Sequence, residues 1–130
     1  MAPAFHLSLS VADLDRTEAF YTGALGARVG RRTRAWIDVW LFGAQVTVYA
    51  RPGGVLPLPQ RDTLHFGATL AWDDWEVLAG RLNEAKAIFR LSPTVDDARG
   101  QAKMMLVDPD GYLIEIKAYR DPEAALNRPL

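Results

Sequence analysis

The sequence predicts an α+β fold made of two similar βαβββ-like modules, each with one strand, one helix and then about three strands. Segments in which apolar and polar residues alternate indicate the strands, and two segments with apolar residues three and four positions apart indicate the helices. The same order of elements occurs in both halves of the chain. Modules that each expose one apolar face are expected to pack into one body, and 130 residues suit one compact domain.

The first module begins with an expected strand at residues 5–11, whose alternation places His6 on its polar face. A helix of about ten residues follows, and Asp13 or Asp15 is expected to cap it. The residues of the first strand expected to face inward are Phe5, Leu7, Leu9 and Val11. Further strands are expected from residue 28 onward, among them 35–42 and 45–49.

The second module repeats this order. Residues 64–70 alternate and carry His65 on the polar face. A helix follows, in which Asp73 and Glu76 have the spacing of a capping box, and residues 92–100 are expected to form a polar loop. The inward-facing residues expected in this helix are Trp75, Leu78, Ala79, Leu82 and Ala85. The remaining strands are expected at 88–91, 103–107 and 113–117.

These segments define the expected domain organisation. The stretch from Arg51 to Gln60 carries three prolines and two glycines, which is typical of a linker or an ordered loop. We therefore expect a single domain, divided into a first module at about 4–50, a linker at about 51–62, a second module at about 63–120 and a C-terminal tail at 121–130.

The internal repeat aligns individual residues. His6 and His65 are 59 residues apart and occupy the same position in corresponding strands. Thr47 and Glu115 are 68 residues apart and also correspond, with the additional residues in the loop before Gly100. Each of the two histidines of the chain is thus the counterpart of the other.

Composition excludes several classes of function. The chain has no cysteine, so disulfides, thiolate metal sites and cysteine nucleophiles are absent. A net charge of −1 provides no field that attracts nucleic acid or an anionic membrane. The N-terminus lacks the pattern of a signal peptide, and no apolar run approaches the roughly 20 residues that span a bilayer. We expect a cytoplasmic protein with no nucleic acid or membrane partner.

The strongest candidate site consists of His6, His65 and Glu115. Imidazole and carboxylate groups suit a divalent transition metal, and two histidines with one carboxylate leave coordination positions open for water and substrate. A carboxylate within an apolar strand needs such a partner, because an unpaired buried charge is costly. The alternative is that both histidines are partly exposed strand residues and that Glu115 pairs with Lys103 or Lys117.

Several motifs carry a family resemblance over almost the whole chain. They are His6-Leu-Ser-Leu-Ser-Val-Ala-Asp-Leu14, then Ala19-Phe-Tyr and Leu25-Gly26, His65-Phe-Gly67, and Asp108-Pro-Asp-Gly-Tyr-Leu-Ile-Glu115. In this order they are specific, and the sequence resembles the vicinal oxygen chelate superfamily, which contains glyoxalases, bleomycin-resistance proteins and extradiol dioxygenases. The resemblance implies two βαβββ modules whose sheets curve around a metal held by His6, His65 and Glu115.

Enzymes of this superfamily bind a substrate through adjacent oxygens on a divalent metal, which acts as Lewis acid and template. The open positions of a three-ligand site favour Fe(II) or Mn(II), and Zn(II) and Ni(II) are compatible. The sequence also departs from the known subfamilies. Thr47 stands where a glyoxalase I supplies a glutamate ligand, and the third histidine of extradiol dioxygenases is absent. Ala124 falls near an arginine position of fosfomycin-modifying transferases, and their serine-rich potassium loop is also absent.

The leading hypothesis is a metal-dependent enzyme that acts on a small oxygen-rich molecule as a lyase, isomerase or dioxygenase. Further candidates for the cavity are Ser8, Trp36, Thr47, Tyr49 and Lys117, of which Ser8, Thr47 and Tyr49 are also catalytic candidates. The alternative is a bleomycin-resistance-type protein that sequesters a planar ligand without catalysis, which Trp36, Trp40 and Tyr49 suggest. Because small relatives often pair modules across a subunit interface, a homodimer is expected.

Overall fold

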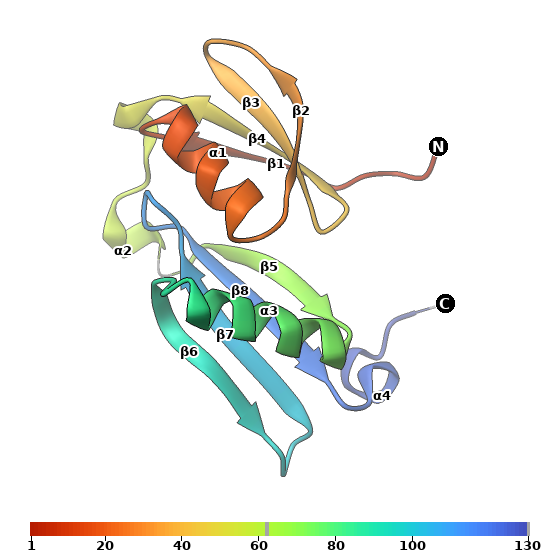
Figure 1. Ribbon diagram of the computed structural model, residues 1–130. Coiled ribbons are helices and arrows are strands. Elements are labelled where there is room, and N and C mark those ends of the chain that lie inside the picture. Colours follow the sequence, from red (N-terminus) through yellow and green to blue (C-terminus); the bar gives the residue numbers. More distant parts are fainter. Residues whose placement is uncertain (62, 130) are drawn as a thin grey trace. The chain divides into compact units, whose positions relative to one another are not determined.

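The computed structural model describes residues 1–61 and 63–129, which form two compact units. Unit 1 comprises Met1–Thr63 and the turn Asp108–Tyr112, and unit 2 comprises Leu64–Val107 and the chain from Leu113 onward. Each unit contains a four-stranded mixed sheet with a helix (Figure 1). The predicted α+β class with two modules is confirmed.

Unit 1 has the strand order β1-β4-β3-β2. Strands β1 and β4 are parallel, and the other two pairs are antiparallel. Parallel neighbours need a long crossover, and α1 with the β2–β3 hairpin provides it. The elements are β1 (His6–Val11), α1 (Leu14–Gly23), β2 (Arg28–Arg32), β3 (Trp36–Leu41) and β4 (Ala44–Ala50), followed by a 3-10 turn at Pro52–Gly54 and α2 (Leu58–Arg61).

Unit 2 has the corresponding order β5-β8-β7-β6, again with a parallel first pair, β5 and β8. The crossover contains α3 and the β6–β7 hairpin. The elements are β5 (His65–Leu70), α3 (Trp72–Glu84), β6 (Phe89–Asp96), β7 (Gln101–Val107), β8 (Leu113–Tyr119) and α4 (Pro122–Leu126). None of the helices in the described part of the chain is both long and apolar enough to cross a membrane.

The core of unit 1 lies between α1 and one face of its sheet. Asp13 is the N-cap of α1, because its carboxylate accepts a hydrogen bond of 2.8 Å from the main-chain N–H of Arg16. Tyr21 of α1 is completely buried. The buried apolar residues of the strands are Leu9, Val11, Ile37, Val39, Leu41, Val46 and Val48. Phe5 was predicted to face inward and does not, because it precedes the first residue of β1 and is 71% exposed.

Unit 2 buries one face of α3 against β7 and β8. The indole N–H of Trp75 donates a hydrogen bond of 2.9 Å to the main-chain oxygen of Ile116. The predicted inward residues Trp75, Leu78, Ala79 and Leu82 are buried, whereas Ala85 lies past the end of the helix and is exposed. Tertiary burial, more than local capping, therefore stabilises this helix.

Three local predictions for the second half were wrong or incomplete. The predicted capping box at Asp73 is absent, because α3 begins at Trp72 and its N-cap, Ala71, offers no side-chain acceptor. The predicted polar loop at 92–100 is partly strand, since β6 continues to Asp96 by pairing with β7. The short helix α4 lies in the predicted tail. In the first two cases tertiary packing or strand pairing overrides the local sequence pattern. Helix α4 instead has a local cap, because the Asp121 carboxylate accepts a hydrogen bond from the main-chain N–H of Ala124.

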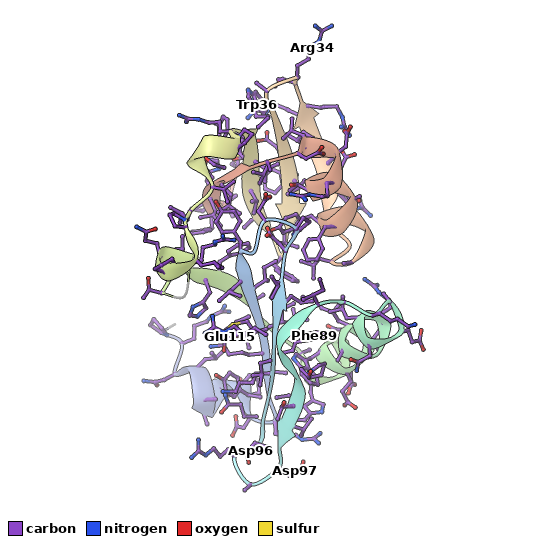
Figure 2. All side chains as sticks on the ribbon, turned by 90° about the vertical axis from the view of Figure 1, so that its left-hand side faces the viewer. Arg34, Trp36, Phe89, Asp96, Asp97 and Glu115 are labelled. Carbon is purple, nitrogen blue, oxygen red and sulfur yellow. The ribbon has the colours of Figure 1, made fainter. Side chains whose placement is uncertain are left out.

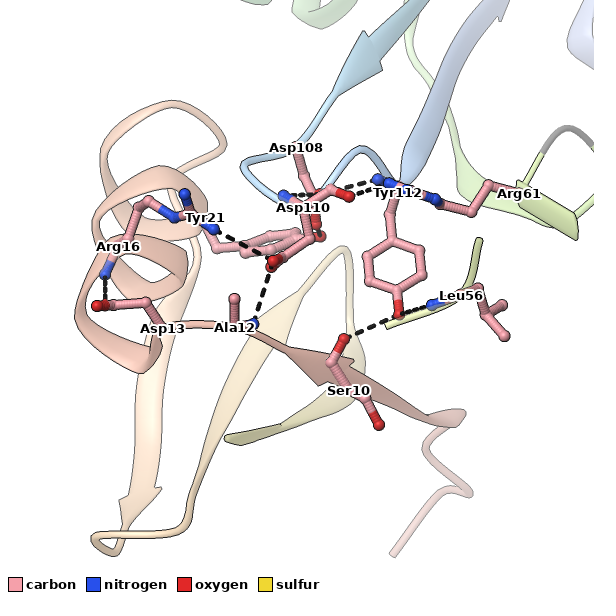
Figure 3. A network of polar contacts seen from close by, with 10 residues as sticks. All are labelled: Ser10, Ala12, Asp13, Arg16, Tyr21, Leu56, Arg61, Asp108, Asp110 and Tyr112. Carbon is pink, nitrogen blue, oxygen red and sulfur yellow. Dashed lines mark hydrogen bonds and ion pairs between the residues drawn. The ribbon is translucent and has the colours of Figure 1, made fainter. Parts of the chain in front are cut away.

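The turn between β7 and β8, which belongs to unit 1, forms a hydrogen-bonded network with other residues of that unit (Figure 3). The carboxylate of Asp108, which is 4% exposed, accepts a bond of 2.8 Å from the hydroxyl of Tyr21. Its second oxygen accepts bonds of 2.9 Å from the main-chain N–H groups of Asp110 and Tyr112. Gly111 adopts φ +91°, a left-handed conformation that glycine accommodates without strain. The Asp-Pro-Asp-Gly-Tyr sequence thus builds a specific turn.

The same turn contacts β1 and the start of α1. The carboxylate of Asp110 accepts bonds from the main-chain N–H of Ala12 and from Arg16, at 3.1 and 3.2 Å. The hydroxyl of Tyr112 donates to the main-chain oxygen of Ser10 at 2.8 Å. A carboxylate near the N-terminus of α1 also complements the helix dipole. These contacts attach a distant part of the sequence to the first strand and helix.

Removal of the Asp108 carboxylate is predicted to destabilise the protein. Asp108→Ala leaves the buried Tyr21 hydroxyl and two turn N–H groups without their acceptor, which should lower the free energy of unfolding by about 2–4 kcal/mol. Urea unfolding measures this value. The matched control is Asp97→Ala. The Asp97 side chain is 86% exposed, and its ion pair with Arg120 is long, at 4.0 Å, so its loss should cost little stability. Equal stability of the two variants would contradict the assignment.

Candidate functional site

The predicted site residues of unit 2 lie on the parallel pair β5 and β8. In this register Gly67 is the partner of Glu115, and His65 lies two residues earlier on β5. A Cβ atom at Gly67 would overlap the main chain of Glu115, so only glycine permits this close approach of the strands. Glu115 projects from the middle of β8 (Figure 2). The sequence thus positions His65 and Glu115 as neighbours.

The two side chains meet directly. His65 Nε2 lies 3.2 Å from Glu115 Oε2, and the side chains are 44% and 22% exposed. Two ligands of one metal ion with bonds of about 2.0–2.2 Å lie about 2.8–3.6 Å apart in octahedral or tetrahedral geometry. The observed separation therefore fits two ligands of one divalent metal, as well as a direct hydrogen bond from a protonated imidazole.

His65 and Glu115 line a pocket of about 330 Å³ that is open to solvent. Lys117, a predicted cavity residue, lines the same pocket, together with Thr69. Within residues 1–61 and 63–129, the carboxylate of Glu115 forms an ion pair with His65. It forms none with Lys103 or Lys117, which were the alternative partners predicted from the sequence. Glu115 is therefore directed toward the imidazole.

In unit 1, hydrogen bonding orients the imidazole of His6. Its Nδ1 lies 3.2 Å from the main-chain oxygen of Gln45. Because a carbonyl can only accept, Nδ1 carries the proton, and in the neutral ring Nε2 keeps a lone pair. The Ser8 hydroxyl donates to this Nε2 at 3.2 Å. An imidazole fixed through a carbonyl on its other nitrogen is the usual arrangement of a metal-ligating histidine.

Thr47, the counterpart of Glu115, has a different partner. It is 4% exposed, and its hydroxyl donates a hydrogen bond of 2.7 Å to Asp38. Ser8 is its register partner on β1, just as Gly67 is the partner of Glu115 on β5. Since the Thr47 hydroxyl already donates its hydrogen bond to Asp38, it can only accept a hydrogen bond from a ligand.

Asp38 is a buried charge whose role was not predicted. It is 1% exposed, and its carboxylate also accepts from Arg31 at 2.7 Å and from Gln45 at 3.2 Å. Burial raises the pKa of Asp38, but the hydrogen bonds from Thr47, Arg31 and Gln45 outweigh burial and hold the pKa below its usual value. An acidic residue within an apolar strand is the same signal that identified Glu115.

The predicted aromatic candidates lie on the two central strands of unit 1. Tyr49 and Trp36 are register partners. Trp36 is half-buried and faces the guanidinium of Arg31, whose carbon is 4.9 Å from the ring centroid. Trp40 is 41% exposed and Tyr49 is 36% exposed. These side chains present an amphipathic surface beside the Asp38 network.

The structure therefore groups the predicted residues by unit. His65, Glu115 and Lys117 line one pocket of unit 2, while unit 1 holds His6 with Ser8 and, separately, Thr47 with Asp38. Neither unit gathers three or more His, Cys, Asp or Glu side chains at metal-binding distances within the described residues.

The model of the Glyoxalase/Bleomycin resistance protein/Dioxygenase superfamily matches residues 4–116. The chain belongs to this superfamily. The resemblance noted in the sequence is therefore confirmed, and the match extends across the residues of both units.

Individual members of the superfamily are similar over most of this chain. A glutathione transferase of Serratia marcescens, FosA, is 28% identical over 116 residues, covering 85% of this chain and 77% of that protein. A glyoxalase/bleomycin resistance protein/dioxygenase from Alicyclobacillus acidocaldarius has a TM-score of 0.73 at 25% identity, covering 93% and 94% of the two chains. The fosfomycin resistance protein FosX of Listeria monocytogenes has a TM-score of 0.72 at 15% identity, covering 91% and 93%.

The lowered pKa of Asp38 predicts how stability depends on pH. Because the folded pKa lies below the unfolded value of about 3.9, the carboxylate stabilises the fold above that value and loses this contribution as pH falls through the folded pKa. Asp38→Asn should be less stable than wild type at pH 7 by about 1–3 kcal/mol. Urea unfolding between pH 3 and 7 should show the two proteins converging below about pH 4. A difference that does not vary with pH would refute this role.

Proposed function

We propose that this member of the superfamily is a metal-dependent enzyme in which His6, His65 and Glu115 hold one divalent cation. The observation that carries the proposal is the 3.2 Å separation of His65 Nε2 and Glu115 Oε2, which suits two ligands of one ion. The main-chain bond that fixes His6 and leaves its Nε2 as an acceptor supports it. Under this proposal the two units function as a single domain with modules at about 4–50 and 63–120.

The substrate would be a small oxygen-rich molecule, and the reaction a lyase, isomerase, transferase or dioxygenase reaction. A bound cation would supply Lewis acidity and a template for adjacent substrate oxygens. Three protein ligands favour Fe(II) or Mn(II), and Zn(II) or Ni(II) would also fit the donor set. The relative named a glutathione transferase supports group transfer at such a site.

Other residues of the chain would bind and orient the substrate. The Ser8 hydroxyl donates a hydrogen bond to His6 Nε2 and has to rotate when that nitrogen binds a ligand, which frees the hydroxyl for the substrate. The Thr47 hydroxyl donates its hydrogen bond to Asp38, so its oxygen accepts a hydrogen bond from a substrate hydroxyl. Trp36 and Tyr49 contribute apolar surface beside it. Lys117 adds positive charge to the pocket of His65 and Glu115.

A second candidate function is sequestration of a planar ligand without catalysis, as in bleomycin-resistance proteins. The exposed rings of Trp40 and Tyr49 favour this alternative. Titration of candidate ligands with tryptophan fluorescence in the presence of a chelator separates the two functions. Binding that needs metal supports the enzyme, and metal-independent binding supports sequestration.

Metal content is predicted to depend on three residues. Reconstituted wild type should bind about one equivalent, and His6→Ala, His65→Ala and Glu115→Gln should each lower the affinity by orders of magnitude, because each removes a direct ligand. Elemental analysis after dialysis measures the content. Glu123→Gln is the matched control, since Glu123 is exposed on α4. Wild-type protein with less than about one tenth of an equivalent would refute the metal site.

The expected homodimer leads to a complementation prediction. If His6 of one subunit completes the site of the other, unfolding and refolding His6→Ala together with Glu115→Gln should restore about a quarter of the wild-type sites, since half the dimers are mixed and each has one intact site. Metal analysis of the refolded mixture measures this. A site built within one chain would show no recovery.

A further inference from the structure

Two of the three lysines in the chain are direct partners on neighbouring strands. Lys103 of β7 is paired with Lys117 of β8 in the antiparallel ladder. Directly opposed residues of such a pair project from the same face, with Cβ atoms about 4.5–5.5 Å apart, and like charges at this distance destabilise a sheet. Lys117 lines the pocket of His65 and Glu115, so this face of unit 2 holds both charges.

Within the described part of the chain, these two charges make no ion pair. Neither Lys103 nor Lys117 makes a side-chain hydrogen bond or ion pair with any residue the structure describes. Glu115, the acidic residue that lines this pocket, is two positions from Lys117 on β8, but its carboxylate contacts His65. Two like charges that face each other in a sheet and have no such partner are suited to a ligand of opposite charge.

Hydroxyl groups flank the two lysines. Thr69 is the partner of Lys117 on β5, and Thr94 is the partner of Lys103 on β6, so one row across the sheet reads Thr69, Lys117, Lys103, Thr94. The Thr94 hydroxyl donates to the main-chain oxygen of Ser92, whereas the Thr69 hydroxyl makes no hydrogen bond within the described chain. Thr69 therefore retains a proton that can be donated to an anion.

We propose that Lys103 and Lys117, together with Thr69, form a subsite for a doubly charged oxyanion, such as the phosphate group of a substrate. The inference rests on the proposed function, because it assigns this subsite to the pocket of His65 and Glu115. Two residues along a strand span about 7 Å, which is the distance between the row of lysines and the row of Glu115. The substrate class is thus a small molecule that carries an oxyanion in addition to its metal-binding oxygens.

The small number of lysines permits a direct test. Reductive methylation with ¹³C-formaldehyde retains the positive charges and gives three lysine signals, assigned with Lys103→Gln, Lys117→Gln and Lys86→Gln. Inorganic phosphate is titrated at constant ionic strength with a chelator present, so that failure of the metal site does not affect the result. The signals of Lys103 and Lys117 should shift saturably and that of Lys86 should not. Loss of either lysine should weaken binding by at least about tenfold.

Phosphate shifts no larger than those caused by chloride, or equal shifts at Lys86, would overturn the proposal. A second measurement keeps the test independent of chemical modification. At low ionic strength Lys103→Gln and Lys117→Gln should each raise the melting temperature of the unmodified protein, because repulsion is relieved, while Lys86→Gln should not. Phosphate should stabilise wild type and Lys86→Gln but neither Lys103→Gln nor Lys117→Gln. Variants of Lys103 and Lys117 that are less stable than wild type would contradict an unpaired, ligand-binding role.

Discussion

Parallel pairing of the first and last strands of each unit is the constraint on which the arrangement of side chains depends. It requires a long crossover, which explains why a helix and a hairpin separate the paired strands in both halves of the chain. It also fixes the register. Ser8 is placed beside Thr47 in unit 1 and Gly67 beside Glu115 in unit 2, so the two halves present equivalent positions on their polar faces.

The two polar faces use equivalent positions for different chemistry. In unit 2 the carboxylate of Glu115 reaches an imidazole, and Gly67 permits the close strand approach that brings them together. In unit 1 the corresponding residue, Thr47, is bonded to a buried carboxylate on the next strand, Asp38. One polar face thus carries the contact between His65 and Glu115, and the other carries the hydrogen-bonded network of Asp38.

Much of the fold was predictable because it depends on patterns with a clear period. Alternation identified the strands, and apolar spacing identified the two longer helices, α1 and α3, and most of their buried residues. The predictions failed where tertiary contacts decide the result. Phe5 continues the alternation but lies before the strand, and β6 extends into polar sequence because β7 supplies partners for its main chain.

The candidate site was predictable in its residue types and less so in its contacts. The matched positions of His6 and His65 identified them, and the structure then showed that His65 approaches Glu115. Asp38 carried the same signal as Glu115, a charge within an apolar strand, but its hydrogen bonds to Thr47, Arg31 and Gln45 cross two neighbouring strands and cannot be inferred without the register. The opposition of Lys103 and Lys117 likewise depends on the register of β7 and β8.

In the proposed metal site, two imidazoles and one carboxylate bind the same ion. X-ray absorption spectroscopy of the metal-reconstituted protein tests this most directly, because multiple scattering from imidazole rings reports how many histidines coordinate the metal. We expect two imidazoles per metal, with the remaining positions filled by oxygen. A wild-type spectrum with a single imidazole, or with none, would contradict it.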